Sequence, residues 1–182
     1  ERVSVIERVS QLEEIKRAYL DRQAGYARQV LVCGGAGCVS SHCQEVQQAL
    51  IEALEANGLT DTVQVLVTGC MGTCAAGPVL LVEPDGIFYT KMDPAKVTDV
   101  VQRHLLDDEV CMEYTFYDAY RKKRVPKLED ISFFREQVRV ALRNCGRMEY
   151  GSLDAYIARD GYAAIAKAVT TMSPQDVVDE MK

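Results

Sequence analysis

Cysteines are the residues of this chain with the clearest capacity for chemistry, and four of them lie in two short glycine-containing segments. The first segment is CGGAGC, residues 33–38, and the second is CMGTC, residues 70–74. A [2Fe-2S] cluster needs four thiolates, with one pair on each iron, and the two segments supply one pair each. This pattern predicts that the metal and cofactor ligands are Cys33, Cys38, Cys70 and Cys74.

Half of the chain's twelve glycines lie in or beside the two cysteine segments: Gly34, Gly35, Gly37, Gly69, Gly72 and Gly77. A cluster held by four thiolates carries net negative charge in a poorly solvated place, so it needs N–H donors aimed at its sulfurs. Glycine suits this task, because a backbone without Cβ can approach closely and can adopt positive φ. We expect these amides to hold the cluster and to tune its potential.

Other metal and redox sites compete with this interpretation. Structural zinc also takes four cysteines, and two to four residues, commonly two, separate the ligands of a pair. The first segment has a gap of four residues, which fits the common zinc spacing poorly. A thioredoxin-like redox dithiol needs two intervening residues, and the sequence contains no such pair. A zinc-stabilised structural domain therefore stays open as an alternative.

The other cysteines and the histidines need separate treatment. Cys43 follows Cys38 by five residues, so it could exchange with Cys38 as a ligand, but its place at the start of a predicted helix favours a bystander thiol. A mixed ligation of the Rieske type needs two histidines, and His42 and His104 are far apart in sequence, so both are predicted to be structural or on the surface. Two single cysteines are predicted to be buried or half-buried thiols: Cys111 and Cys145.

The elements around the cysteine segments follow the order of a thioredoxin-type sheet covered by helices. A short β-branched strand, 29–33, leads into the first segment, and another, 63–67, leads into the second. Hydrophobic periodicity predicts helices over 8–24 and 44–56, the latter ending at Asn57-Gly58. A hairpin with Pro84-Asp85-Gly86 as its turn and a helix from Asp93-Pro94 to about residue 105 complete the domain.

The remaining chain is predicted to divide into a linker and a helical part. Residues 107–130 are charged and aromatic, with a basic run at 121–124 that is either a solvated surface or a docking site for an acidic subunit. Residues 131–182 read as helices at 133–142, 153–158, 162–169 and 173–182, the last capped by Ser173. The expected division of the chain is therefore an N-terminal helix, 1–27, the cysteine-bearing domain, 28–106, a linker, 107–130, and a helical part, 131–182.

Composition limits the class of protein. The chain has 182 residues, 48% of them hydrophobic, and no apolar run long enough to cross a bilayer. The formal net charge of −6 argues against a nucleic-acid binder. Seven cysteines, an odd number without a secretory signal, indicate metal ligands rather than a disulfide framework and make the cytoplasm the expected location, without membrane insertion.

Several motifs together resemble a known family. The two cysteine segments, Gly77-Pro78 and Phe88-Tyr89 resemble the thioredoxin-like [2Fe-2S] ferredoxin module that begins the NADH-binding (beta) subunits of soluble and electron-bifurcating [FeFe] hydrogenases and NAD-dependent formate dehydrogenases. Residues 133–139, 142–146 and 156–162 are similar to the helical lead-in of the flavoprotein subunit that these enzymes share with complex I. The resemblance implies an α/β fold: a thioredoxin-like [2Fe-2S] ferredoxin domain followed by a small all-helical segment.

The resemblance also implies a function. The four paired cysteines would be the cluster ligands, and FMN, NAD(H) and a [4Fe-4S] cluster would belong to the same polypeptide beyond residue 182. The chain would be a fragment of an NADH-dependent oxidoreductase subunit that relays single electrons between the flavin and partner subunits or a ferredoxin. On its own it would only transfer electrons, with no catalytic residues. The alternative is a free-standing electron carrier or docking module.

Overall fold

The structure is a computed structural model that describes residues 6–182. It divides into two compact units. The larger consists of Gly25–Tyr150, and the smaller combines residues 6–24 with Gly151–Lys182. Each unit is described by itself.

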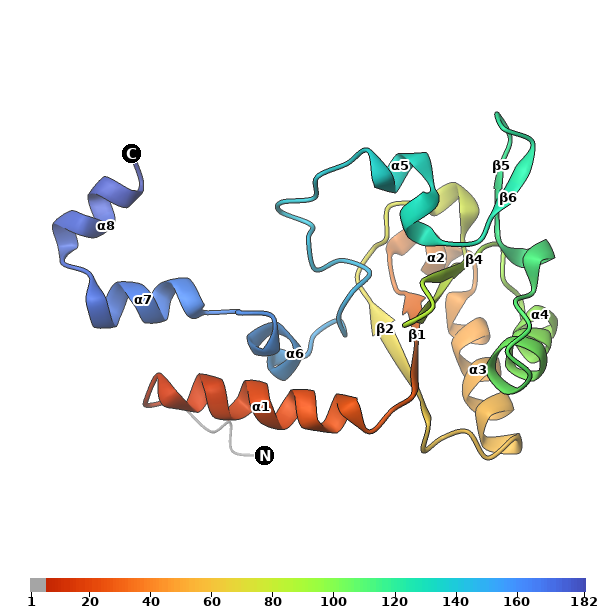
Figure 1. Ribbon diagram of the computed structural model, residues 1–182, viewed down its shortest axis with the longest axis horizontal. Coiled ribbons are helices and arrows are strands. Elements are labelled where there is room, and N and C mark those ends of the chain that lie inside the picture. The colour runs from red at the N-terminus through yellow and green to blue at the C-terminus, as the bar shows by residue number, and fades with distance from the viewer. Residues whose placement is uncertain (1–5) are drawn as a thin grey trace. The chain divides into compact units, whose positions relative to one another are not determined.

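A four-stranded sheet forms the centre of the larger unit (Figure 1). The strands lie in the order β2 (Val63–Thr68), β1 (Arg28–Cys33), β3 (Leu80–Glu83) and β4 (Ile87–Tyr89). β1 is parallel to β2, whereas β3 is antiparallel to both of its neighbours. The strands and the β3–β4 hairpin predicted from the sequence are thus confirmed, with ends shifted by one or two residues.

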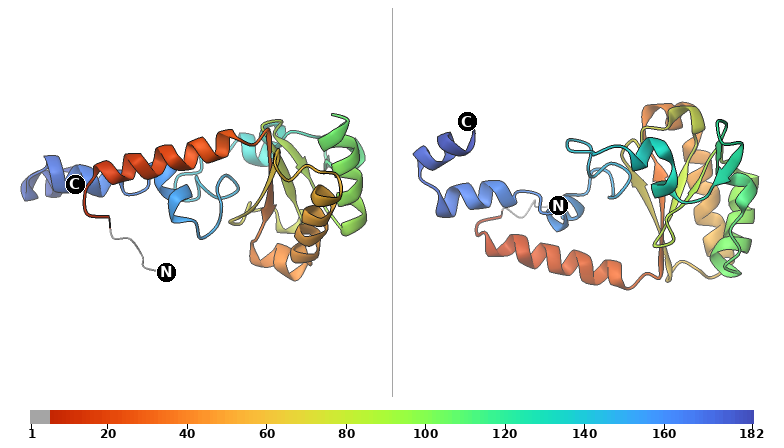
Figure 2. Two further views of the ribbon diagram at one scale, coloured as in Figure 1. Left: turned by 90° about the horizontal axis from the view of Figure 1, so that it is seen from below. Right: turned by 45° about the horizontal axis from the view of Figure 1, so that its top comes forward.

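Helices α3 (Cys43–Ala56) and α4 (Pro94–Asp99) lie side by side over one face of the sheet (Figures 1 and 2). The buried residues of α3 recur at helical spacing, at Val46, Leu50 and Leu54, as the periodicity predicted. α4 continues into a π-helical turn, Val100–Leu106, whose buried side chains extend the same core. The two helices therefore seal the sheet on this side.

Local signals set the ends of these helices. The Asp93 side chain accepts a hydrogen bond from the Lys96 N–H at 3.0 Å, and Pro94 occupies the first turn of α4. Asn57 caps the C-terminus of α3, and Gly58 follows with φ of 65°, a conformation that favours glycine. Both signals were read correctly from the sequence.

The opposite face of the sheet is covered by a short helix, α5 (Ser132–Arg135). Successive side chains of a strand point to opposite faces, so Phe88 and Tyr89 of β4 lie on different sides of the sheet. Phe88 packs edge-on against Phe134 of α5, with ring centroids 6.1 Å apart, and Tyr89 packs against His104 of the π-helical turn at 5.7 Å. The two buried aromatic residues thus anchor both covering layers to one strand.

The predicted linker, residues 107–130, is a structured part of the larger unit. It holds the hairpin β5 (Phe116–Asp118) and β6 (Lys123–Val125) and two single turns of 3-10 helix. Backbone hydrogen bonds attach it to β4, with the Thr90 N–H donating to the Tyr114 carbonyl at 2.9 Å and the Phe88 N–H to the Pro126 carbonyl at 2.8 Å. The segment extends the sheet edge and does not separate two domains, so the linker prediction was wrong.

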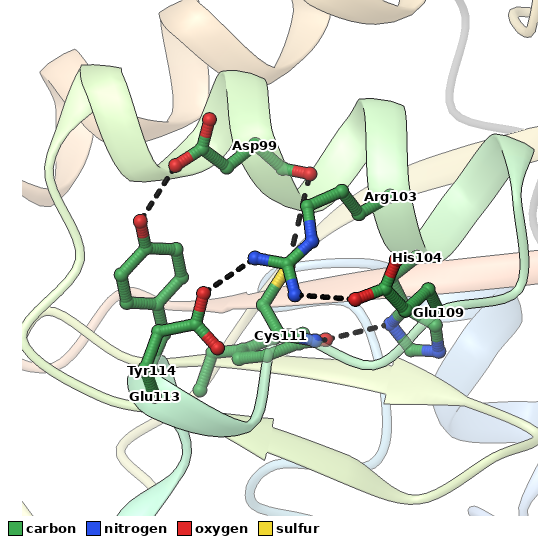
Figure 3. Close-up of polar contacts among 8 residues, drawn as sticks. Asp99, Arg103, His104, Glu109, Cys111, Glu113 and Tyr114 are labelled. Atoms are coloured by element: carbon green, nitrogen blue, oxygen red, sulfur yellow. Dashed lines mark hydrogen bonds and ion pairs between the residues drawn. The ribbon is translucent and has the colours of Figure 1, made fainter.

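Polar contacts hold the start of this segment against α4 and the π-helical turn, as Figure 3 shows. The Arg103 guanidinium forms ion pairs with Glu109 and Glu113. The Tyr114 hydroxyl donates to the Asp99 carboxylate at 2.6 Å. Two acidic side chains of the predicted linker, Glu109 and Glu113, are therefore paired with an arginine of the π-helical turn.

The helix predicted over 133–142 is also wrong, because α5 ends at Arg135. The following chain is irregular, and Val138, Val140 and Leu142 are 92%, 78% and 61% exposed. Its backbone pairs instead with the end of β2: the Tyr150 N–H donates to the Val67 carbonyl at 2.7 Å. Tertiary pairing has overridden local helix propensity here.

The smaller unit contains four helices: α1 (Ser10–Ala24), α6 (Leu153–Ala158), α7 (Ala163–Thr171) and α8 (Pro174–Glu180). α1 packs against α6, and two ion pairs join the chain segments, Lys16 with Asp160 at 2.6 Å and Arg22 with Asp154 at 2.8 Å. Ser173 forms a capping box at the start of α8, as predicted. None of the helices among residues 6–182 is both long and apolar enough to cross a membrane.

Candidate iron–sulfur site

The two cysteine segments begin at the same edge of the sheet. Cys33 is the last residue of β1 and is paired in register with Thr68, the last residue of β2. Since the two strands are parallel, the chain leaves both at one end, and the segments that follow lie next to each other. Cys38 lies in the short helix α2 (Ala36–Ser40), and Cys74 begins a 3-10 turn. The sheet therefore brings together the four cysteines predicted as ligands.

Three glycines let the two segments approach each other closely. A Cβ built on Gly35 would lie 2.9 Å from Cys70 Sγ, and one on Gly37 would lie 3.1 Å from Cys74 Sγ. Just after the second segment, a Cβ on Gly77 would lie 3.0 Å from Cys38 Sγ. A Cβ on Gly35 would clash with Cys70, and a Cβ on Gly37 or Gly77 would force the neighbouring cysteine to move by a few tenths of an ångström, so each of these glycines leaves space that a cysteine uses.

The thiols are arranged as two pairs. Cys33 and Cys38 flank the first segment, Cys70 and Cys74 flank the second, and none of the four is in a disulfide. Among residues 6–182, no three His, Cys, Asp or Glu side chains surround one point as ligands of a single metal ion. Two thiol pairs on two segments can supply the two ligands that each iron of a [2Fe-2S] cluster needs.

The two pairs differ in solvent exposure. Cys33 and Cys38 are buried, at 3% and 2%, whereas Cys70 and Cys74 are exposed. Burial, with the hydrogen bond and charge of Cys33 adding to it, raises the pKa of the Cys38 thiol to about 12. The Gly72 N–H hydrogen bond lowers the pKa of the Cys70 thiol, but burial and the neighbouring thiols together outweigh it and raise that pKa. One side of the site faces the core and the other faces solvent.

Hydrogen-bond donors for a sulfur-bearing group lie in the second segment. The Gly72 N–H donates to Cys70 Sγ at 3.4 Å, and Gly72 is the one of the six loop glycines with positive φ, at 89°. Thr73 Oγ1 is buried and has no hydrogen-bond partner among residues 6–182. A buried hydroxyl without a partner is costly, and a cluster sulfur would supply an acceptor. The residues present therefore fit a [2Fe-2S] group.

The remaining cysteines and the histidines have the helix position and burial that the sequence predicted, and the bystander role of Cys43 stays a prediction. Cys43 is the buried first residue of α3, Cys111 is fully buried and Cys145 is half-buried. His42 is exposed and contacts Glu45 at 3.0 Å. His104 is buried in a structural network with Tyr89, described below.

Sequence reasoning missed a third segment beside the site. Cys145 Sγ lies 3.5 Å from the position of a Cβ on Gly69, next to the second cysteine segment. The Gly146 N–H donates to Thr68 Oγ1 at 3.0 Å, and Gly146 also packs against Met71. Residues 131–150, expected to begin a separate helical part, thus line the second segment inside the larger unit. The one sequence signal was Gly146, whose φ of 77° marks a turn.

Comparison with known protein families agrees with this geometry. A family described as thioredoxin-like [2Fe-2S] ferredoxin matches residues 8–105, more than half of the chain. The chain belongs to this family. A thioredoxin-like [2Fe-2S] ferredoxin domain transfers electrons, so the predicted fold class and the electron-transfer character of the domain are confirmed.

Individual relatives of this ferredoxin domain fall into two groups. The "Ferredoxin, 2Fe-2S" of Clostridium pasteurianum is 33% identical over 73 residues, which cover 40% of this chain and 72% of the relative. The NADP-reducing hydrogenase subunit HndC of Solidesulfovibrio fructosivorans is 50% identical over 48 residues, covering 26% of this chain and only 10% of that subunit. A solved structure of the Aquifex aeolicus thioredoxin-like [2Fe-2S] ferredoxin matches with a TM-score of 0.45 and 32% identity, covering 49% of this chain and 89% of that one.

Proposed function

We propose that Cys33, Cys38, Cys70 and Cys74 hold a [2Fe-2S] cluster through which the chain relays single electrons. The observation that carries this proposal is the meeting of two thiol pairs at one sheet edge, with Gly35, Gly37 and Gly77 each leaving room for a cysteine of the opposite segment. A bound cluster of this kind accepts and releases one electron at a time. The protein holds the cluster between a buried and an exposed thiol pair.

We further infer that the chain is part of the NADH-binding subunit of a soluble oxidoreductase of the hydrogenase or formate dehydrogenase type. The match to HndC supports this, although it covers a tenth of that subunit. FMN, NAD(H) and a [4Fe-4S] cluster would then lie elsewhere in the polypeptide. Partner subunits or a ferredoxin would exchange electrons with the site, and the cytoplasm stays the expected location.

A free-standing ferredoxin is the second candidate function. The Clostridium pasteurianum relative favours it, because the aligned residues span 72% of that small protein. The two candidates share the cluster and differ in the remaining polypeptide. The mass of the native polypeptide recognised by an antibody against residues 6–182 separates them: a subunit much larger than 20.3 kDa supports the oxidoreductase, and one of about that mass supports the carrier.

The cluster itself is tested by anaerobic purification of the chain. We expect two irons and two acid-labile sulfides per chain, visible absorption in the oxidised state and an electron paramagnetic resonance signal after reduction. Replacing each predicted ligand by Ser in turn should reduce iron content sharply, and Cys111→Ser is the matched control that should not. One zinc per chain, with no iron or sulfide, would show that the site is a structural zinc centre.

A further inference from the structure

A group of cations lines a surface pocket in the larger unit. The pocket has a volume of about 280 Å³, and its lining consists of Arg121, Lys123, Arg124, Val125, Pro126, Asp130 and Arg135. The four consecutive cations 121–124 are exposed, in a chain whose formal net charge is −6. Within the part of the chain that the structure describes, Lys122 and Lys123 form no ion pair, so their charge is available to a partner.

This cationic region is connected to the candidate iron–sulfur site through α5. Phe133 Cε1 lies 3.8 Å from the position of a Cβ on Gly72, between the two exposed cysteines. Two residues further along α5, Arg135 lines the pocket. Figures 1 and 2 show α5 and the β5–β6 hairpin at the end of the larger unit where β1 leads into α2. The cations therefore lie at the same end as the proposed cluster.

The tip of the β5–β6 hairpin presents an exposed aromatic side chain on an ordered turn. Tyr120 is 94% exposed. Asp118 Oδ1 accepts hydrogen bonds from the backbone N–H groups of Tyr120 and Arg121, at 3.0 Å and 2.9 Å, and so orders the turn. Protein interfaces are enriched in Tyr, Phe and Arg, and Phe133 on α5 is 49% exposed. Tyr120 and the exposed part of Phe133 therefore add aromatic surface to the cations of this region.

We propose that this basic face, defined as Tyr120, Arg121, Lys122, Lys123, Arg124, Phe133 and Arg135, docks an acidic one-electron carrier protein. The inference rests on the proposed function, because a carrier would exchange electrons here only if a cluster is bound at the cysteines on either side of Gly72. Charge complementarity steers an acidic protein to the face and fixes its orientation, which brings the carrier to the solvent-exposed thiol pair. A long-range attraction between opposite charges is screened by salt, so docking has a measurable signature.

The test measures binding rather than turnover. The chain is purified with its cluster, and isothermal titration calorimetry records the Kd for an acidic plant-type [2Fe-2S] ferredoxin, both proteins oxidised. The variant R121E/K122E/K123E reverses the cations at the hairpin tip and leaves Arg124, whose side chain bonds the Thr115 carbonyl, in place. We expect its Kd to rise at least about tenfold at low salt, because like charges then face each other. Raising the salt should weaken binding by the unaltered chain, whereas it should strengthen the weak binding of the variant, because salt screens attraction in the first and repulsion in the second.

Two controls separate charge at this face from other effects. The variant R8E/R17E/K167E makes the same change in net charge on the smaller unit and should leave the Kd unchanged. The variant R121K keeps the charge and should bind like the unaltered chain. Carbodiimide cross-linking followed by mass spectrometry should join carrier carboxylates to Lys122 or Lys123.

Each remaining outcome has a definite meaning. Equal Kd values for the unaltered chain and R121E/K122E/K123E, with the visible spectrum of the cluster present in both, would overturn the docking proposal while leaving the proposed function intact. Binding of inorganic pyrophosphate that the charge reversal abolishes, with carrier binding unaffected, would make the pocket a small-anion site and likewise overturn it. A chain that purifies without iron would refute the proposed function instead.

Discussion

Gly35 lies directly against Cys70, so that a Cβ on Gly35 would sit 2.9 Å from both Cβ and Sγ of that cysteine and 3.2 Å from its Cα. The two residues belong to different cysteine segments, one after β1 and the other after β2. Because backbone atoms are among those contacted, rotating the Cys70 side chain cannot relieve the clash. The separation of the two segments is therefore set by the absence of a side chain at position 35.

We expect Gly35→Ala to separate the two thiol pairs and to reduce bound iron to less than half that of the unaltered chain. Overpacking of this kind costs about 1–3 kcal/mol, too little to unfold the domain. Iron content and thermal unfolding measured on the same preparation check this. Gly58→Ala is the matched control, since Gly58 has a φ of 65° but open space around it. It should lose stability and keep its iron. Full iron in Gly35→Ala would show that the close contact is irrelevant to the site.

Thr73→Val should lower the reduction potential of the cluster, because removing a donor near the sulfurs disfavours the more negative reduced state. Loss of one hydrogen bond of about 1.4 kcal/mol corresponds to about 59 mV for a one-electron couple. Redox titration followed by electron paramagnetic resonance measures the shift, and Thr73→Ser should restore the original potential. If Thr73→Val instead stabilises the fold without moving the potential, the hydroxyl is simply an unsatisfied buried group that no sulfur contacts.

Cys43→Ser is expected to keep both irons and an unchanged spectrum, since Cys43 lies within the first turn of α3 and packs in the core. The hydroxyl in an apolar place should cost roughly 1–3 kcal/mol of unfolding free energy. Cys145→Ser is expected to keep its iron as well, despite the position of Cys145 beside Gly69. Loss of iron in Cys43→Ser alone would transfer one ligand position from Cys38 to Cys43.

Stability should fall as the pH drops below about 6.5, the ordinary pKa of histidine. Burial lowers the pKa of His104 despite the opposing charge of Asp85. The Tyr89 hydroxyl accepts the Cys111 N–H at 3.3 Å and lies 2.9 Å from His104 Nδ1, and His104 Nε2 lies 3.3 Å from the Asp85 carboxylate. The unfolded chain therefore binds a proton that the folded chain resists, and stability is fully present only above that pH.

Urea unfolding between pH 8 and pH 5.5 measures this dependence, whose slope cannot exceed about 1.4 kcal/mol per pH unit for one proton. His104→Gln should remove most of the slope above pH 6. His42→Gln, a change at the exposed histidine that pairs with Glu45, should retain it. An unchanged slope in His104→Gln would assign the pH dependence to the carboxylates.

Local sequence patterns predicted most of the strands and helices around the cysteine segments. β1, β2 and the helix α3 follow from short-range hydrophobic spacing, and Asp93, Asn57 and Ser173 mark helix ends through hydrogen bonds to neighbouring backbone. The segment 107–150 escaped prediction because its partners are distant in sequence. The Pro126 carbonyl accepts the Phe88 N–H, and the Tyr150 N–H donates to the Val67 carbonyl, each across a long stretch of the chain.

The sequence by itself determined the chemistry of this protein: two cysteine pairs of defined spacing, the strands that carry them and the glycines beside them. Only the tertiary structure decided which cysteine each glycine accommodates, that one thiol pair is buried and the other exposed, and that residues 131–150 and a basic hairpin lie at the same end of the sheet. The reason is physical. Spacing along a chain governs contacts within one element, whereas contacts between elements depend on the register of β1 with β2 and on the packing of distant segments.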